Sequence, residues 1–586
     1  MAIYTPSQSP AVFTREIDLT NGVPNVPTST GAFVGNFRWG PVREPLLINN
    51  EATLAKTFGN PDTTTSVDFH SAAYYLRYSD DLYVVREIVE SNIYSLNAYD
   101  SDAVASPAAD GPRILNLENF NGQEAALESD GHTIIAKYPG TLGASLLVSI
   151  CGSDSDGADS DYTNWNYKGY FDGAPGTSSY ATGKQASNDE VHVVVIDEAG
   201  EFTGTRGTVL ETYSYVSLAS DAKTTDGSSN YIKDVVNARS SYVWLVGYGT
   251  TLTAAYAGTA ATTGKNYKFN GPIDISLSNG ANSSNLTATD YATGFDLLED
   301  PDTYLLDFLI APGMSTSEAQ VSVVNDLVSI AQSTRKDCMV ITSPYRGAVV
   351  NNTTPRASTI TSISSFTRSS YLVVDNNYLK IYDKYNDGYV YIPAASSTAG
   401  IMAATDNNFA PWYSPAGTRR GQYLGITSLA YSANKSDRDE LYKAGVNPIA
   451  NIPGQGVLLY GDKTHLARPS AFDRINVRRL FLVLERAIAA AAQNILFEFN
   501  DEFTRAEFVN IIEPLLRDVK GRRGITDFKL VCDETNNTAE IIDTNQFIAT
   551  LFIKPARSIN FITLNFVAVR TGVSFEELVG DNGVTI

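Results

Sequence analysis

The chain has 586 residues, of which 43% are hydrophobic, and its formal net charge is −22. This length and apolar content suffice for roughly three or four folded domains and argue against wholesale disorder. An acidic chain without a basic patch lacks the charge pattern of a nucleic-acid-binding protein, so we expect no direct contact with nucleic acid.

The chain begins with a segment that is unsuited to fold by itself. Residues 1–22 are rich in Pro, Ser and Thr around one short strand-like run of Ala11, Val12, Phe13 and Thr14. Because so short a run buries little surface, we predict an N-terminal arm that adds a strand to the sheet of a core domain. A frayed terminus is the alternative.

Residues 23–90 and 301–440 together predict one discontinuous α/β domain. In the first part, a strand at 32–35 is followed by a helix at 51–58 that Asn50 caps and Gly59 ends. A second helix at 68–78 and a strand at 81–86 complete this part.

The second part of this domain has a β-α-β order. An apolar strand at 305–310, a helix at 315–334 and a strand at 337–342 follow one another. This order implies a parallel strand pair with a right-handed crossover.

The intervening residues, 91–300, have a different character. They hold 26 acidic against 10 basic residues. Strand-like runs such as 146–150 and 191–196 recur between turns rich in Gly, Ser, Thr, Asn and Asp. We predict an inserted β-rich domain that presents a solvated, self-repelling outer surface.

Residues 441–568 predict a core domain of helices on a mostly antiparallel sheet. One helix is expected at 473–493, and a capping box at Thr504 and Glu507 opens a second that Pro514 should kink. Strands are expected at 527–533, 546–554 and 559–570. At least one edge of this sheet should be free to receive a strand from a partner.

A C-terminal arm and a set of charges complete the sequence. The arm is residues 569–586, and its expected strand is Val573, Ser574 and Phe575. Residues 466–586 hold 16 acidic and 14 basic residues, a balance that suits pairing between copies. The candidate inter-subunit charges are Arg474, Arg478, Arg479, Glu485, Arg486, Arg522, Arg523 and Asp527. Each could instead be an ordinary surface charge worth about 0–1 kcal/mol.

The sequence contains no constellation that indicates catalysis. The histidines, His70, His132, His192 and His465, do not stand at metal-ligand spacing, so structural roles are expected. The loop at 258–265 fails the phosphate-loop spacing. An acidic loop with Asp154, Asp156, Asp159 and Asp161 has Ala158 where an EF-type calcium loop needs a ligand. We therefore predict no catalytic, cofactor-binding or metal-binding residues, and no enzyme.

The cysteines and the first residues of the chain indicate the cellular compartment in which the protein is made. Cys151, Cys338 and Cys532 are far apart and odd in number, which predicts buried thiols in a reducing cytoplasm. The first residues lack the pattern of a secretory signal, and no apolar stretch approaches the ~20 residues of a membrane helix. We expect a soluble protein without membrane insertion.

Long motifs in the C-terminal half resemble contractile bacteriophage tail sheath proteins, and the T-even-type myophage branch most closely. They include DKYND at 383–387, VYIP at 390–393, SPAG at 414–417, LYGDKT at 459–464, FDRINVRRLF at 472–481 and KPARSINFITLNFVA at 554–568. The N-terminal motifs STGA at 29–32, WGP at 39–41, TFG at 57–59 and DLYVVR at 81–86 also match. Residues 91–300 depart from the family and are shorter than in its T-even-type members.

The resemblance implies a structural protein of the virion, assembled in the host bacterial cytoplasm. Family members stack as hexameric rings around a tail tube, and their arms add strands to neighbouring subunits. The partners implied are copies of itself, the tail tube protein, and the baseplate and tail terminator proteins. Contraction from a metastable extended state would drive the tube through the host envelope.

Three alternatives remain open from sequence. A surface adhesin would show calcium-dependent glycan binding by the 91–300 region. A tail-associated hydrolase would act on cell-wall polymer. A bacterial contractile injection system would use the same mechanism in another setting, and genome context would separate it from a phage.

Overall fold

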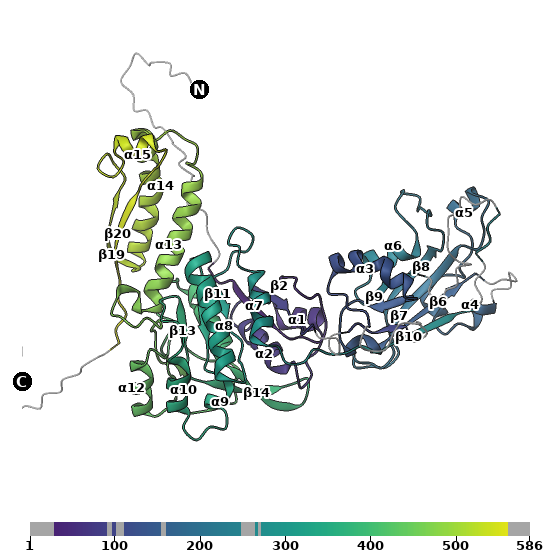
Figure 1. Cartoon of the computed structure of the whole chain (residues 1–586), viewed down its shortest axis with the longest axis horizontal. Helices are drawn as coiled ribbons and strands as arrows, with labels where there is room; N and C mark the ends of the chain where they lie inside the picture. The colour runs from purple at the N-terminus through teal and green to yellow at the C-terminus, as the bar shows by residue number, and fades with distance from the viewer. Residues whose placement is uncertain are drawn as a thin grey trace, which may run out of the picture.

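Figure 1 shows a computed structural model of the chain, which forms three units joined one to the next in a bent arrangement. The structure describes residues 28–90, 96–100, 111–153, 160–247, 264–267 and 271–560. A unit built on an antiparallel sheet lies at one end, an α/β unit lies in the middle, and a pair of long helices with a short sheet lies at the other end. The fold is therefore mixed α/β with several sheets.

The α/β unit is built on a six-stranded sheet with the order β13-β12-β11-β1-β3-β2. Its strands are β1 (Gly31–Gly35), β2 (Leu46–Ile48), β3 (Leu82–Arg86), β11 (Phe308–Ile310), β12 (Met339–Thr342) and β13 (Leu372–Val374). All neighbours pair in parallel except β2 and β3, which are antiparallel. The sheet thus combines strands from both sides of the long intervening segment.

Local signals explain the first helix of this unit. The helix α1 (Glu51–Phe58) begins where the Asn50 side chain accepts a hydrogen bond from the Thr53 N–H at 2.8 Å. It ends at Gly59, whose φ of 76° lies in the left-handed region that glycine tolerates. Both assignments confirm the prediction. The next helix is α2 (Ser66–Tyr75).

The predicted β-α-β crossover is also confirmed. The helix α8 (Ser317–Ser329) joins β11 to β12, which pair in parallel, and a wider π-helical turn follows it at Ile330–Arg335. The remaining helices of the unit are α7 (Ala288–Asp296), α9 (Arg346–Val349), α10 (Pro355–Ile363), α11 (Ala395–Asn408) and α12 (Lys435–Lys443). Two small antiparallel sheets complete it: β14 (Tyr378–Asp383), β15 (Gly388–Pro393) and β16 (Ser428–Leu429), then β17 (Ile449–Ile452) and β18 (Gly456–Leu459).

The intervening segment forms an antiparallel seven-stranded sheet with the order β8-β7-β6-β10-β4-β5-β9. Its strands are β4 (Tyr99–Asp100), β5 (Ile134–Ala136), β6 (Leu146–Gly152), β7 (Glu190–Asp197), β8 (Thr208–Ser217), β9 (Val243–Leu245) and β10 (Ile273–Ser278). Helices α3 (Leu117–Ser129), α4 (Ser160–Asn164), α5 (Ser179–Gly183) and α6 (Ile232–Arg239) accompany them. The helix α3 was not predicted from the sequence; its Phe120 stacks on Trp244 with ring centroids 4.4 Å apart.

The third unit contains α13 (Ile475–Gln493), α14 (Glu502–Gly521), β19 (Ile525–Val531), α15 (Ala539–Asp543) and β20 (Thr550–Pro555). The helix predicted at 473–493 is confirmed. The predicted capping box is wrong, because Asp501 caps α14 by accepting a hydrogen bond from the Thr504 N–H at 2.8 Å. Thr504 therefore lies inside the first turn. The helix runs on through Pro514.

Candidate assembly surface

The sheet of the third unit is small in the part of the chain that the structure describes. The strands β19 and β20 pair antiparallel from Val531↔Thr550 to Ile525↔Pro555, and α14 packs beside β19. Within the described residues this sheet has only these two strands, so each outer edge presents backbone donors and acceptors to further strands. The third strand predicted here begins at 559, but 559 and 560 are not in a strand and the remainder lies outside the described residues.

The residues predicted to add strands are the arms. The N-terminal run Ala11, Val12, Phe13 and Thr14 and the C-terminal run Val573, Ser574 and Phe575 lie outside the described residues. Their role as inter-subunit strands stays a prediction.

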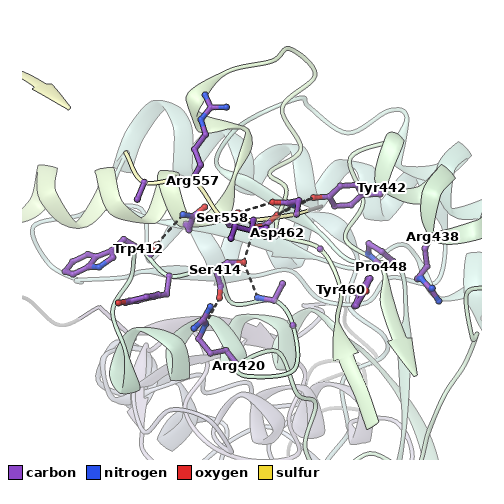
Figure 2. A pocket seen from close by; sticks show the side chains of 18 of the residues that line it. Trp412, Ser414, Arg420, Arg438, Tyr442, Pro448, Tyr460, Asp462, Arg557 and Ser558 are labelled. Carbon is purple, nitrogen blue, oxygen red and sulfur yellow. Dashed lines mark hydrogen bonds between the residues drawn. The ribbon is translucent and has the colours of Figure 1, made fainter. Parts of the chain in front are cut away.

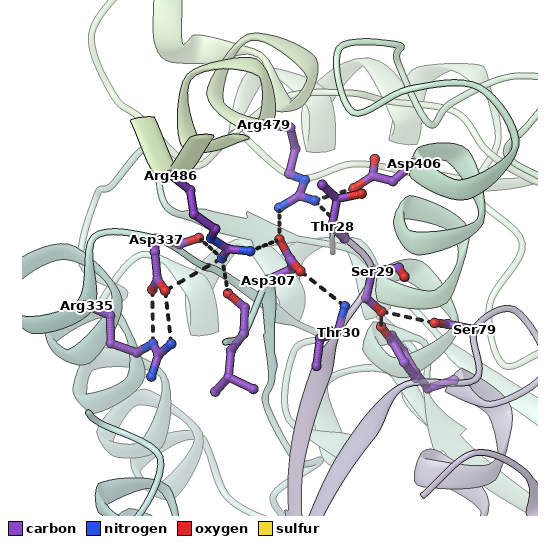
Figure 3. Close-up of polar contacts among 12 residues, drawn as sticks. Thr28, Ser29, Thr30, Ser79, Asp307, Arg335, Asp337, Asp406, Arg479 and Arg486 are labelled. Carbon is purple, nitrogen blue, oxygen red and sulfur yellow. Dashed lines mark hydrogen bonds and ion pairs between the residues drawn. The ribbon is translucent and has the colours of Figure 1, made fainter. Parts of the chain in front are cut away.

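A buried ionic cluster joins α13 to the chain just before the inner strands β11 and β12 of the six-stranded sheet (Figure 3). We call it the Asp307 cluster; its members are Asp307, Arg335, Asp337, Asp406, Arg479 and Arg486. Asp307 lies just before β11 and accepts from Arg479 and Arg486, both at 3.2 Å. Arg479 also contacts Asp406 of α11 and donates to the Thr28 carbonyl at 2.6 Å. The cluster therefore connects α13 to four other segments of the chain, around Thr28, Asp307, Asp337 and Asp406.

Arg479 is the most deeply buried charged side chain that α13 contributes to this cluster. Its side chain is 1% exposed and lies over the Phe308 ring at 4.5 Å. Burial opposes its charge, but Asp406 and Asp307 outweigh that effect and hold the Arg479 pKa above its ordinary value. An arginine fixed by two carboxylates holds α13 in one position against the sheet.

Four of the predicted inter-subunit charges have partners inside the chain, and a role for them between subunits stays a prediction. Arg479 and Arg486 belong to the Asp307 cluster, and Arg474 pairs with Asp462 at 2.8 Å. Arg478 lies between the rings of Tyr371 and Phe472. The reason is that α13 packs against the α/β unit along this face, so its basic residues are covered.

The other four predicted charges are exposed. They are Glu485, Arg522, Arg523 and Asp527. Arg522 lies over Trp412 and near Asp518, and Asp527 pairs with Lys520 at 3.0 Å. A role for these residues between subunits stays a prediction.

A second group of polar residues binds the segment that follows β20 (Figure 2). We call it the Asp462 cluster; its members are Ser414, Tyr442, Asp462, Arg474, Ser558 and Asn560. Ser558 donates to the Asp462 carboxylate at 2.7 Å and Asn560 donates at 3.2 Å. The buried carboxylate thus fixes residues 558–560 on the surface of the α/β unit.

The Asp462 carboxylate is held in its charged form. Burial opposes ionisation, but the Ser558 hydrogen bond, the Arg474 charge and the Asn560 and Ser414 hydrogen bonds keep its pKa below the ordinary aspartate value. Its contribution to stability is therefore present above the ordinary aspartate pKa and is lost only as the pH falls through the lowered pKa. No sequence motif indicated this centre.

We expect Asp462→Ala to release the segment that follows β20. Each lost hydrogen bond to a charged group is worth about 1.5–3 kcal/mol, so the released state should become at least roughly tenfold more populated. Trypsin cleavage after the exposed Arg557 should accelerate by a similar factor. Asp439→Ala, which removes an exposed carboxylate that lines the same pocket, is the matched control, and equal cleavage rates in both variants would contradict this role of Asp462.

The Asp462 cluster lies in a pocket of about 740 Å³. Its walls include the aromatic residues Trp412, Tyr413, Tyr442 and Tyr460 and the basic residues Arg420, Lys435, Arg438, Arg523 and Arg557. The pocket is therefore aromatic and basic, unlike the acidic chain as a whole.

The residues searched for chemistry are dispersed. The four histidines and three cysteines are buried, and the cysteines are free thiols. Asp154, Asp156 and Asp159 of the acidic loop lie outside the described residues. Within the part of the chain that the structure describes, no three potential ligands gather to hold a metal ion, and no helix is long and apolar enough to cross a membrane.

Three segments of the chain match models of known protein families. Residues 28–86 match the N-terminal region of domain III of the tail sheath protein Gp18. Residues 284–465 match the central domain of phage tail sheath proteins, and residues 467–568 match the C-terminal domain. The matches leave 87–283 between the first and the second.

Individual proteins are similar to this chain over nearly its whole length. The chain is 32% identical to the tail sheath protein of Enterobacteria phage T4, with 98% of this chain and 99% of that protein covered. It is 30% identical to the tail sheath protein of Vibrio phage KVP40, again with 98% and 99% covered. The latter alignment spans 697 residues, so this relative contains segments that have no counterpart here.

Solved structures support the fold. The sheath tail protein Lin1278 from Listeria innocua superposes with a TM-score of 0.54 over 92% of this chain and 94% of that one, at 12% identity. The sheath tail protein DSY3957 from Desulfitobacterium hafniense gives a TM-score of 0.51 over 92% and 100%, at 11% identity.

Proposed function

This chain belongs to the phage tail sheath family, and on that premise we propose that it polymerises as stacked hexameric rings around a tail tube. Its relatives are structural proteins of contractile tails, not enzymes. The observation that carries the proposal is the sheet of β19 and β20, which has two strands within the described residues, beside the fixed exit of the C-terminal segment.

In this proposal the arms of neighbouring subunits complete the open sheet. The runs Ala11–Thr14 and Val573–Phe575 add strands to β19 and β20 of adjacent copies, and backbone hydrogen bonds supply the affinity. Such contacts are head-to-tail and do not close on themselves along the tail axis, which is how helical polymers form.

Contraction then needs rigid bodies joined by flexible connections. The Asp307 cluster holds α13 of the third unit on the α/β unit, so these two units move as one body. Release of a metastable extended state lets these bodies rotate into a tighter lattice and drives the tube through the host envelope. The tail tube, baseplate and tail terminator proteins are the expected partners in the virion, which is assembled in the host cytoplasm.

We expect chains that lack residues 1–20 or 569–586 to fold but to remain monomeric. The physical reason is that each deletion removes a strand that a neighbour needs, while the described cores keep all their residues. Sedimentation velocity gives the mass and electron microscopy shows the tubes. Normal tubes from both truncated chains would contradict the proposed mesh of arms.

A further inference from the structure

The connection between α13 and α14 exposes a concentrated apolar surface. We call residues 494–503 the phenylalanine tip; Leu496, Phe497, Phe499 and Phe503 are 62%, 103%, 84% and 77% exposed. Soluble proteins rarely expose large apolar residues in such density unless a partner covers them. The tip therefore indicates an interaction site.

The backbone of the tip points to the same conclusion. Phe497 has a φ of +72°, in the left-handed region that bulky residues rarely adopt. Such a conformation costs of order 1–3 kcal/mol and commonly occurs at functional sites. In this chain it directs the most exposed aromatic ring into solvent.

The tip is also acidic. Glu498, Asp501 and Glu502 are exposed among its phenylalanines. Of the basic residues beside it, Arg505 is buried and donates to Asn500 at 2.9 Å. A partner surface should therefore combine aromatic or apolar walls with positive charge.

The pocket around the Asp462 cluster has this combination (Figure 2). Tyr460 is 51% exposed at the pocket, with the Arg438 guanidinium 5.6 Å from its ring centroid. Arg420 lies 5.3 Å from the ring centroid of Tyr413. The acidic residues here are Asp462, which Arg474 neutralises, and Asp439. Basic groups thus outnumber the acidic ones, and guanidinium groups already lie beside aromatic rings.

The positions of tip and pocket prevent one chain from joining its own two surfaces. Asn476, at the first turn of α13, lines the pocket, whereas the tip follows the last turn of the same helix. The 19 residues of α13 span about 28 Å along the helix axis. The two surfaces are therefore held apart at opposite ends of one rigid element.

We propose that the phenylalanine tip of one copy inserts into the basic aromatic pocket of another copy. The inference rests on the proposed assembly into a sheath and adds a second contact to the exchange of arms. Because the joined surfaces differ, the contact is head-to-tail and propagates from copy to copy. Ser558 and Asn560 also line the pocket, so an inserted tip lies against the segment from which the C-terminal arm departs.

A cross-linking experiment on the full chain tests the contact. Chains with Glu498→Cys and chains with Asp439→Cys are mixed, assembled and treated with a short thiol cross-linker; the three natural cysteines are buried. We expect a cross-linked dimer of the two chains at least tenfold above a control that pairs Glu498→Cys with Leu47→Cys, which lies on β2.

Charge reversal gives an independent readout. Arg438→Glu should raise the concentration needed for assembly at least tenfold, and Glu498→Lys in the same chain should restore it to within threefold. If wild-type chains form tubes but neither the cross-link nor the rescue is found, this inference is wrong while the sheath proposal stands. A tip that cross-links to the tube protein instead of another copy would also overturn it. If wild-type chains form no tubes, the sheath proposal itself fails.

Discussion

Replacing Arg479 with methionine is expected to lower the stability of α13 by about 3–5 kcal/mol, the usual cost of removing one partner from a buried ion pair. The variant leaves the Asp406 carboxylate buried without its cation, and it leaves Asp307 with Arg486 as its remaining arginine partner. It also frees the Thr28 carbonyl. Hydrogen exchange of the α13 amides measures the effect, because protection there reports the opening free energy of the helix.

Two further variants make this test specific. Arg523→Met removes an exposed arginine and should change the free energy by less than about 0.5 kcal/mol. Arg479→Met combined with Asp406→Leu should recover at least half of the loss, since an apolar pair no longer leaves Asp406 as an unpaired buried charge. Unchanged α13 protection in the single variant would show that the cluster does not hold the helix.

The second large effect concerns a buried carboxyl in the α/β unit. Asp375 directly follows β13 and is fully buried, and its oxygens accept from Ser343 at 2.8 Å, Asn377 at 3.2 Å and Thr398 at 3.1 Å. Within the described residues no basic side chain pairs with it. Burial raises the Asp375 pKa to about 7, although these hydrogen bonds act in the opposite direction.

Such a group makes the protein less stable as the pH rises. The folded state binds the Asp375 proton more tightly than the unfolded state, so stability is full below the ordinary aspartate pKa and falls until the pH passes about 7. The total loss is roughly 4 kcal/mol. The Asp375→Asn variant does not titrate at this position, so its stability relative to wild type should be lowest near pH 4. By pH 8 the wild type has lost most of the roughly 4 kcal/mol, and the relative stability of the variant should have risen by that amount. Urea unfolding of both proteins at several pH values measures it, and parallel stability curves would contradict the account.

Local patterns in the sequence predicted local structure well. Asn50 and Gly59 bound α1 as expected, and apolar spacing located α13, because these signals depend on residues within one or two helical turns. Asp501 was missed as the cap of α14 because Thr504 and Glu507 offered an equally good pattern one turn later. Sequence alone does not say which of two caps the chain uses.

The polar centres could not be predicted, because they join distant parts of the chain. Asp307 lies 172 residues from Arg479, and Asp462 lies 96 residues from Ser558. The basic residues of α13 were recognised as a charged set, but the surface that covers them is formed only by the folded α/β unit. The phenylalanine tip did leave a signal, since an apolar run at 495–497, followed by Phe499, in a connection between helices is unusual.

Electron microscopy of the purified full-length protein tests the central claim most directly. We expect hollow tubes or stacked rings with six subunits per ring. Six-fold averages should show the third units of neighbouring copies joined through sheets of more than two strands. A protein that remains monomeric at every concentration, or tubes in which β19 and β20 receive no strand from a neighbour, would contradict it.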